Sequence, residues 1–310
     1  MSKRLLLWGI AILALIALPP VAAALNQLFY IDLVRRIMIL AIAATSLNLI
    51  LGYGGMVSFG HAAYLGIGAY SVGILAFYGV TSGPLQWLVA VLASALVALA
   101  IGAVSIRTSG IYFIMITLAF TQMLYYLGIS IAEFGGDDGM RLKAKSQFAG
   151  LIDLKDPIVF YYVALAFMLF SVFLIHKIVN SRFGMVLRAS KSNEARSRAI
   201  GFSPYPYRLA AFVIAGAMCG LAGALYANHT SYITPGFMSW HQSGDFMFMV
   251  ILGGMASTAG PVLGAFALLL VEEILKGWTE HWQVVLGPLL VLCVIFFRRG
   301  LAGVFFRSNE

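Results

Sequence analysis

The feature that most constrains this chain is a stretch from Ile37 to Ile106 without Asp, Glu, Lys or Arg. It is about 70 residues long, several times the roughly 20 apolar residues that one bilayer-spanning helix needs. The whole chain is 61% hydrophobic and 10% charged, whereas soluble domains carry about 25% charged residues. A β-barrel would show short alternating strands, and these apolar runs are continuous. The sequence therefore predicts an all-α, polytopic membrane protein.

We expect one transmembrane domain over residues 1–310, with about eight membrane spans and one broken segment. The apolar runs long enough to cross a bilayer are Leu5–Leu25, Ile37–Leu51, Met56–Tyr78, Pro84–Ile106, Ile111–Ala132, Pro157–Ile175, Leu209–Ala227 and Val284–Phe297. A further run, near residues 246–275, is interrupted by Gly253-Gly254 and by Gly260-Pro261, and such residues interrupt helices. It predicts two half-helices, or a short re-entrant helix followed by a span.

The first apolar run has an alternative interpretation. Lys3-Arg4, the long apolar run and Ala22-Ala23-Ala24 imitate a secretory signal peptide. The apolar stretch is longer than the usual core of a signal peptide. We therefore expect an uncleaved first span.

Basic residues decide the predicted orientation, because cytoplasmic loops carry an excess of Lys and Arg. We place the N-terminus inside and let the broken run return to the side that it entered from. The inside then holds Lys3, Arg4, Arg107, Lys177, Arg182, Arg188, Lys191, Arg196, Arg198, Arg208, Arg298, Arg299 and Arg307, and the outside holds Arg35, Arg36, Arg141, Lys143, Lys145, Lys155 and Lys276. Both termini are thus predicted to be cytoplasmic. The net charge of +8 follows from these loops, and we expect no nucleic acid as a partner.

The largest inside loop, residues 180–208, carries the signals of a short helix outside the bilayer. Asn193 or the serine before it can cap the helix, and Glu194 suits its positive end. Gly201 can end the helix in a left-handed conformation, and the following proline prevents its continuation. A helix of about two turns is marginal alone in water, so we expect a partner to dock against it. The alternative is a basic loop that fixes topology or contacts anionic lipid.

A second unusual stretch, Leu47–Tyr70, reads LNLILGYGGMVSFGHAAYLGIGAY and interrupts its own helix with glycines. Broken backbone at membrane depth is tolerated only where it is buried in protein or faces a water-filled cavity. We interpret this stretch and the broken run as parts of a translocation path or gate. The candidate residues are Asn48, Gly54, Gly55, Ser58, His61, Gly253 and Gly254.

The alternative for these residues is close helix packing with hydrogen bonds between helices. For His61 we prefer that alternative. No second His or carboxylate accompanies it at metal-ligand spacing, and we expect no metal site. Asp245 precedes the broken run at the outer face, where we interpret it as a helix cap; contact with a substrate amine is the alternative. The outer loop, residues 133–156, is a candidate contact for a partner outside the membrane.

Four motifs, in the expected order, resemble those of the branched-chain amino-acid transporter permeases of the ABC importer class, specifically the M-type subunit. Leu47–Tyr70 resembles the family's LNLxLGYxGxxSxGHAAxxGIGAY, and GGDDGM from Gly135 resembles GGxDGL. The inside loop resembles the coupling segment SxxGxxLRAxxxNExxAxxxG, and ILGGMASTAGPVLGA from Ile251 resembles xxGGxGSxxGPxxGA. The resemblance covers about Ile37 to Phe297. The chain departs from the coupling motif of the wider class, because its Glu194-to-Gly201 spacing is one residue longer.

The resemblance implies a complex in the bacterial plasma (inner) membrane. Its other members are a second permease subunit of the H-type, two ATP-binding cassette subunits and a periplasmic substrate-binding protein. The residues implied in coupling to the ATPase are Gly184, Arg188, Asn193, Glu194 and Gly201. Branched-chain amino acids are the expected substrates; urea or short amides are alternatives.

The residues themselves agree that this chain is not an enzyme. The sequence has no G-x-x-x-x-G-K-[ST] phosphate loop, so ATP hydrolysis is expected in partner subunits, and no cofactor is expected here. A stand-alone secondary carrier or channel is a rival, but such proteins usually carry a membrane-buried carboxylate. An intramembrane enzyme is a weaker rival, because the spans hold no convincing carboxylate pair, His cluster or Ser–His pair.

Overall fold

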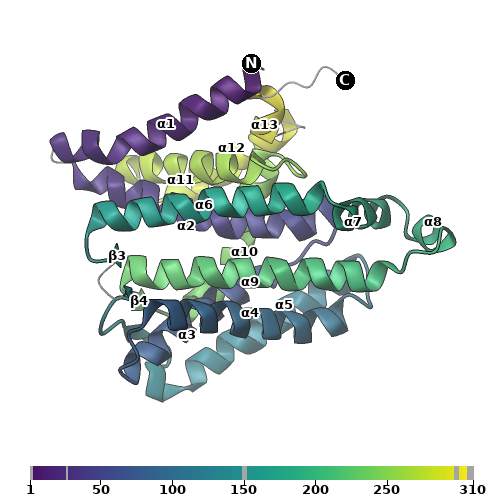
Figure 1. Cartoon of the computed structure of the whole chain (residues 1–310), viewed down its shortest axis with the longest axis horizontal. Coiled ribbons are helices and arrows are strands. Elements are labelled where there is room, and N and C mark those ends of the chain that lie inside the picture. The colour runs from purple at the N-terminus through teal and green to yellow at the C-terminus, as the bar shows by residue number, and fades with distance from the viewer. Residues whose placement is uncertain (1–2, 26, 149–151, 297–299, 306–310) are drawn as a thin grey trace.

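The computed structural model describes residues 3–25, 27–148, 152–296 and 300–305, and these form a helical bundle (Figure 1). The helices are α1 (Lys3–Ala24), α2 (Leu28–Asn48), α3 (His61–Phe77), α4 (Gly83–Ser105), α5 (Ile111–Ser130), α6 (Pro157–Val179), α7 (Arg182–Ser192), α8 (Glu194–Ala199), α9 (Pro204–Thr230), α10 (Trp240–Gly253), α11 (Gly260–Trp278), α12 (Trp282–Phe296) and α13 (Gly300–Phe305). Shorter elements are the π-helical turn η1 (Leu49–Tyr53), the 3₁₀ turns η2 (Ala132–Phe134) and η3 (Pro235–Met238), and the strands β1 (Met140–Arg141), β2 (Gln147–Phe148), β3 (Ile152–Asp153) and β4 (Tyr232–Ile233).

Helix α2 forms the centre of the bundle. It packs against α6, α9, α10 and α11. In the segment Leu28–Tyr53, which joins α2 and η1, 94% of the most apolar 18 residues are buried inside the protein. Small side chains at Ala41, Ala43 and Ala44 let the neighbouring helices approach closely. The absence of charged residues from Ile37 to the end of α2 therefore reflects burial in protein rather than contact with lipid.

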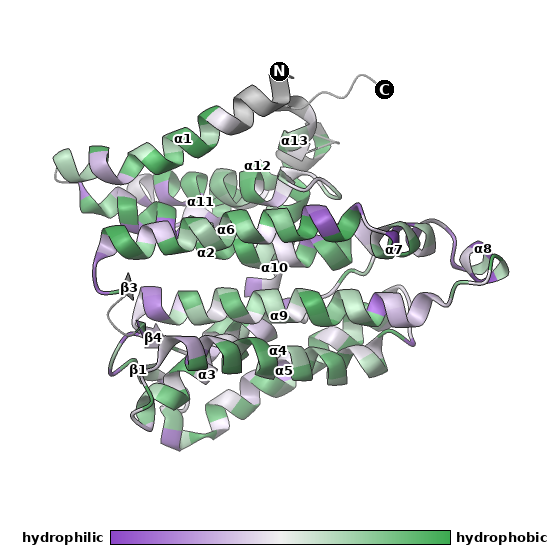
Figure 2. Ribbon diagram, viewed as in Figure 1, coloured by the Kyte–Doolittle hydropathy of each residue, from purple (hydrophilic) through white to green (hydrophobic). Residues whose placement is uncertain are grey.

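The outer helices show the opposite pattern, because their apolar side chains face outward. Leu96, Ile111 and Tyr112 are 65%, 71% and 76% exposed. Figure 2 shows hydrophobic colour along the helices and hydrophilic colour gathered near the two ends of the bundle. Within the described residues, five helical segments are long and apolar enough to cross a membrane: Leu28–Tyr53, Gly83–Ser105, Ile111–Ser130, Pro157–Val179 and Pro204–Thr230. Shorter apolar helices accompany them, so the predicted polytopic membrane protein is confirmed.

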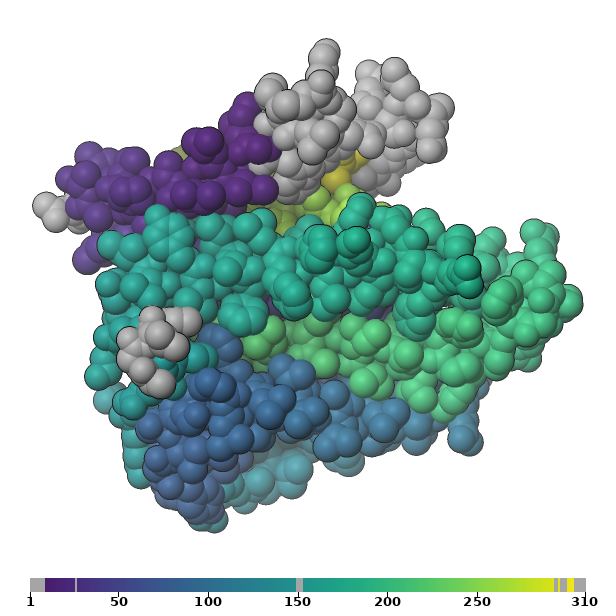
Figure 3. All heavy atoms as spheres, viewed as in Figure 1, coloured from purple at the N-terminus to yellow at the C-terminus, as the bar shows by residue number. Residues whose placement is uncertain are grey.

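The two ends of the bundle differ. One end, here called the strand end, carries two antiparallel strand pairs, β1 with β4 and β2 with β3. The opposite end carries α7 and α8, which protrude from the bundle (Figure 3), and is called the loop end. Three basic residues of the predicted inside, Arg298, Arg299 and Arg307, lie outside the described residues.

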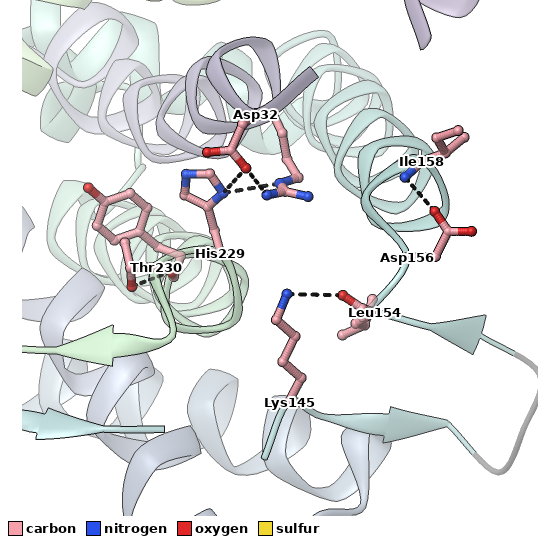
Figure 4. A network of polar contacts seen from close by, with 9 residues as sticks. Asp32, Lys145, Leu154, Asp156, Ile158, His229 and Thr230 are labelled. Atoms are coloured by element: carbon pink, nitrogen blue, oxygen red, sulfur yellow. Dashed lines mark hydrogen bonds and ion pairs between the residues drawn. The ribbon is translucent and has the colours of Figure 1, made fainter. Parts of the chain in front are cut away.

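The structure corrects the predicted start of the second span, because α2 begins at Leu28 and so includes Arg35 and Arg36. Arg35 is only 4% exposed. Its guanidinium pairs with Asp32, and its Nε donates to Nδ1 of His229 over 3.0 Å. Asp32 and His229 face each other from α2 and α9 in Figure 4. Arg35 can be buried because it pairs with Asp32, three residues away, and donates to His229, 194 residues away. The distant partner cannot be recognised from the apolar run around Arg35.

The loop that precedes α6 is fixed to the strand end by polar contacts. The Ser146 amide donates to the Asn228 side chain over 2.8 Å, and the Ser146 hydroxyl donates to Gln86 over 2.5 Å. Lys145 donates to the carbonyl of Leu154 over 3.3 Å (Figure 4). Partial burial, and next the charge of Arg35, lower the pKa of Lys145 below its usual range. These contacts tie the outer loop to α4 and α9.

The predicted broken segment forms a helical hairpin. Gly253 lies against Gly260, and Gly264 lies against the carbonyl of Met249, so α10 and α11 run antiparallel at close range. A Cβ on Gly253 would come within 1.8 Å of the Gly260 oxygen, which explains the need for glycine. The break between residues 253 and 260 is confirmed.

The prediction that Asp245 caps this segment is wrong. The cap is Ser239, whose hydroxyl accepts from the amide of Gln242 over 3.4 Å. Helix α10 begins at Trp240, ahead of the apolar run, because a serine offers the orphan amides of the first turn an acceptor. Asp245 therefore lies inside the helix.

Candidate functional site

The inside loop folds into two helices rather than one. Asn193 accepts from the amide of Arg196 over 2.9 Å and caps α8, as predicted, and Gly201 adopts a φ of +90° after it. An additional helix, α7, precedes α8 and is capped by Ser181, whose hydroxyl accepts from Gly184 over 3.4 Å. The sequence analysis missed α7, whose buried face consists of Gly184, Val186, Leu187 and Ser190.

Helix α7 packs tightly against the end of α6. A Cβ on Gly184 would come within 2.1 Å of the Val179 carbonyl oxygen, so only glycine permits this approach. Leu187 is fully buried beneath the same face. Arg188 is exposed on the other side, and its Nε lies 3.4 Å from the Gly184 carbonyl. The loop is therefore docked on the bundle rather than free in solvent.

Glu194 joins the two helices of the loop to the next span. One carboxylate oxygen pairs with Arg198 over 2.5 Å and the other with Arg208 on α9 over 2.7 Å. Arg208 also donates to the carbonyl of Ser190 at the end of α7 over 3.0 Å. Ion pairs as exposed as the one with Arg198 contribute little individually. The pair with Arg208 is more enclosed, because the Arg208 side chain is only 16% exposed.

The first helix break lies directly beside this loop. Helix α2 continues directly into η1. The chain then leaves helical geometry at Gly55, whose φ is +69°. Lys191 of α7 donates from Nζ to the carbonyl oxygen of Gly52 over 2.6 Å. The last carbonyls of a helix lack helical partners and favour a cation, so Lys191 stabilises this end of the α2–η1 segment.

Asn48 joins the first break to the second. Its side-chain amide donates to the carbonyl of Ser257 over 2.8 Å, and its side-chain oxygen accepts from the amide of Ala256 over 3.1 Å. Asn48 itself is fully buried. A Cβ on Gly52 would lie 2.0 Å from the Asn48 side-chain oxygen and 2.6 Å from the Ala256 nitrogen. Both breaks thus lie at the loop end, held together by one side chain.

The remaining candidates of the first stretch are packed polar groups. The Ser58 hydroxyl accepts from the amide of Gly60 over 3.1 Å. His61 is fully buried, with Nε2 2.7 Å from the Ser46 hydroxyl. Because that hydroxyl donates its only proton to the carbonyl of Ala43, the imidazole donates to it. Within the described residues, no group of three His, Cys, Asp or Glu side chains could hold a metal ion.

The structure therefore brings together several residues that the sequence analysis selected separately. A cavity of about 170 Å³ has Gly54, Gly55, Glu194 and Arg208 in its walls. Gly254, with a φ of +113°, ends α10 next to the Asn48 contact. Lys191 and Arg208 were missed as site residues, because their role depends on carbonyl and carboxylate partners distant in sequence.

A bundle of apolar helices, two interrupted segments and a loop docked at one end are features expected of a membrane permease. The chain belongs to the family described as branched-chain amino acid transport system, permease component, which it matches over residues 29–294. It is thus the permease component of an ABC transporter rather than a catalytic subunit.

Curated relatives agree with this family. The chain is similar to the high-affinity branched-chain amino acid transport system permease protein LivM of Salmonella typhimurium, with 29% identity over 87% of this chain and 69% of the relative. The LivM protein of Escherichia coli gives the same identity and coverage. A probable LivM of Methanocaldococcus jannaschii is 25% identical over 83% of this chain and 85% of the relative. No solved structure gives a significant match.

Proposed function

We propose that this chain is one of two permease subunits of an importer for amino acids, with branched-chain amino acids as the first candidates. The similarity to the LivM proteins supports this substrate class. Urea and short amides are the alternative substrates within the same importer mechanism. Membership of an ABC permease family favours this mechanism over a stand-alone carrier or channel.

For the topology, we propose a single domain of about eight spans in the plasma membrane plus the α10–α11 hairpin. The hairpin enters from the strand end and turns beside Asn48, which lies next to η1 at the loop end. This returning path supports the arrangement that the basic residues predict, with the loop end and both termini in the cytoplasm.

The loop end offers a surface for an ATP-binding subunit. A groove of about 530 Å³ lies between α7 and α8. Met185, Ile200 and Phe202 line it and are 53%, 65% and 44% exposed. Exposed apolar residues on an otherwise basic loop outside the membrane favour a protein partner over lipid headgroups. In this proposal Gly184, Arg188, Asn193, Glu194 and Gly201 shape that surface.

The observation that carries the proposal is the continuous contact from this surface to both breaks. Movement of α7 acts on the first break through the Lys191–Gly52 hydrogen bond. The first break acts on the second through Asn48. A docked ATPase therefore has a direct mechanical connection to the two segments in which the membrane helices are interrupted.

The strand end is the proposed contact for a periplasmic binding protein. Its loop is pinned by Asn228 and Ser146, and the Tyr232 hydroxyl donates to the carbonyl of Asp138. Asp137 and Asp138 lie on this ordered platform.

The first test is purification of the tagged chain from its own membranes in mild detergent. We expect a second permease chain and an ATP-binding subunit in stoichiometric amounts. The complex in proteoliposomes, supplied with its binding protein and internal ATP, should accumulate leucine. Recovery of the chain alone, with transport that does not require ATP, would overturn the proposal.

A further inference from the structure

A further cavity, open along one side, lies away from the loop, and none of the residues that line it belongs to α7 or α8. Its volume is about 760 Å³, and its walls come from α2, α10, α11 and α12. Sites for small molecules usually measure about 300–1,000 Å³. Its buried wall is apolar and includes Leu40 and Leu290, whereas Phe248 lies at its open side and is 44% exposed.

The charged groups of the cavity gather toward the strand end. Arg36 follows the first turns of α2, Asp245 is in the second turn of α10, and Glu272 is in the last turns of α11. All three of these helix ends lie at the strand end. The cavity thus has a charged end toward the predicted outer side, here called the mouth, and apolar walls along the rest of its length.

The charged residues of the mouth do not form one-to-one ion pairs, because Glu272 has two cationic partners. Arg36 is 3.6 Å from Glu272, whereas Lys276 holds Glu272 more closely, over 2.5 Å. Glu272 therefore keeps a cation even when Arg36 turns to another anion. Among the described residues, Asp245 has no ion-pair partner within 4 Å.

From this arrangement we infer that the cavity receives a zwitterionic α-amino acid with an apolar side chain. Arg36 binds the α-carboxylate, Asp245 binds the α-ammonium group, and the apolar walls hold the side chain. Charge-assisted hydrogen bonds to both ends of the zwitterion fix its orientation. Urea and neutral amides would use neither charge. The inference rests on the proposed importer function and specifies its substrate class and site.

The first test changes the charge of the cavity in the complete transporter. Asp245→Asn should lower leucine uptake by about tenfold at saturating loaded binding protein, because the ammonium group loses its partner. Asp245→Glu keeps the charge and should retain most of the uptake. Glu273→Gln is the matched control, because Glu273 is a neighbouring carboxylate that does not line the cavity. It should import at the unmodified rate.

The second test fills the cavity with a bulky side chain. Gly287 lines the cavity, and a Cβ on it meets no atom within 4 Å, so Gly287→Phe is chosen to place a large ring there. Gly277 has equally open surroundings on α11 but does not line the cavity. We expect Gly287→Phe to block uptake and Gly277→Phe to leave it unchanged. Both complexes should retain their subunits on size exclusion.

A direct readout is photolabelling of the loaded, functioning complex with a leucine analogue that carries a diazirine in its side chain. Labelled peptides should come from α10 and α12. Normal uptake by Asp245→Asn and Gly287→Phe, with labels elsewhere, overturns the site and leaves the importer function intact. Loss of the second permease from the Gly287→Phe complex would show a subunit interface instead. Failure of the unmodified complex to import leucine would defeat the importer proposal itself.

Discussion

Replacement of Asn48 by leucine tests whether the two helix breaks act as one unit. Leucine nearly preserves the volume but removes both hydrogen bonds, to Ala256 and to Ser257. Each contributes about 1 kcal/mol net, so their loss weakens the link by about 2 kcal/mol. That free energy corresponds to about a 30-fold change in the population of the linked state. We therefore expect the number of leucine molecules imported per ATP hydrolysed to fall by up to about 30-fold.

The control is Asn228→Leu, which removes buried hydrogen bonds of the same kind at the strand end. It should destabilise the protein comparably but leave the import-to-ATP ratio unchanged. The assay is uptake of labelled leucine alongside phosphate release in the same proteoliposomes, normalised to intact complex. An unchanged ratio for Asn48→Leu, or an equal fall in both variants, would refute the mechanical link.

Three further changes test the loop end by the same assay. Lys191→Met keeps the aliphatic stem but loses the bond to the η1 carbonyl; it should lower the import-to-ATP ratio about fivefold, whereas Lys177→Met should not. Gly52→Ala places a methyl group on the Asn48 oxygen and should reduce uptake strongly, while Gly244→Ala, in open space within a helix, should be neutral or slightly stabilising in a thermal melt. Glu194→Gln weakens the pair to α9 and should leave ATP hydrolysis running with little uptake; normal uptake would reject its coupling role.

The apolar runs predicted most of the helices because a membrane span must satisfy its own backbone and cover itself with apolar side chains. The first break was predictable for a related reason. Glycines destabilise a helix, so several of them close together in an apolar run indicate that the helix is interrupted there. The hairpin break followed from Gly253-Gly254 in the same way.

The contacts that make the site could not be predicted from the sequence. The Asn48 bridge spans more than 200 positions, and its acceptor and donor are backbone groups that any residue would supply. In the sequence, Lys191 is one of several basic residues in the predicted inside loop. In the structure it donates to the Gly52 carbonyl at the end of the α2–η1 segment. The start of α2 was misplaced because the buried Arg35 pairs with Asp32 and donates to His229, a partner on a distant helix.

The π-helical geometry of η1 has a consequence for how a tightly packed central helix can take part in transport. A π turn holds one more residue per turn than the α-helix on which it follows, so η1 stores one residue of slack. Tightening of that turn to α geometry would release the residue and rotate the segment beyond it by about 100°. In such a change, helix α2 keeps its packing while the glycines after η1 shift by one residue. The helix most enclosed by protein can therefore remain still while its last turn does the switching.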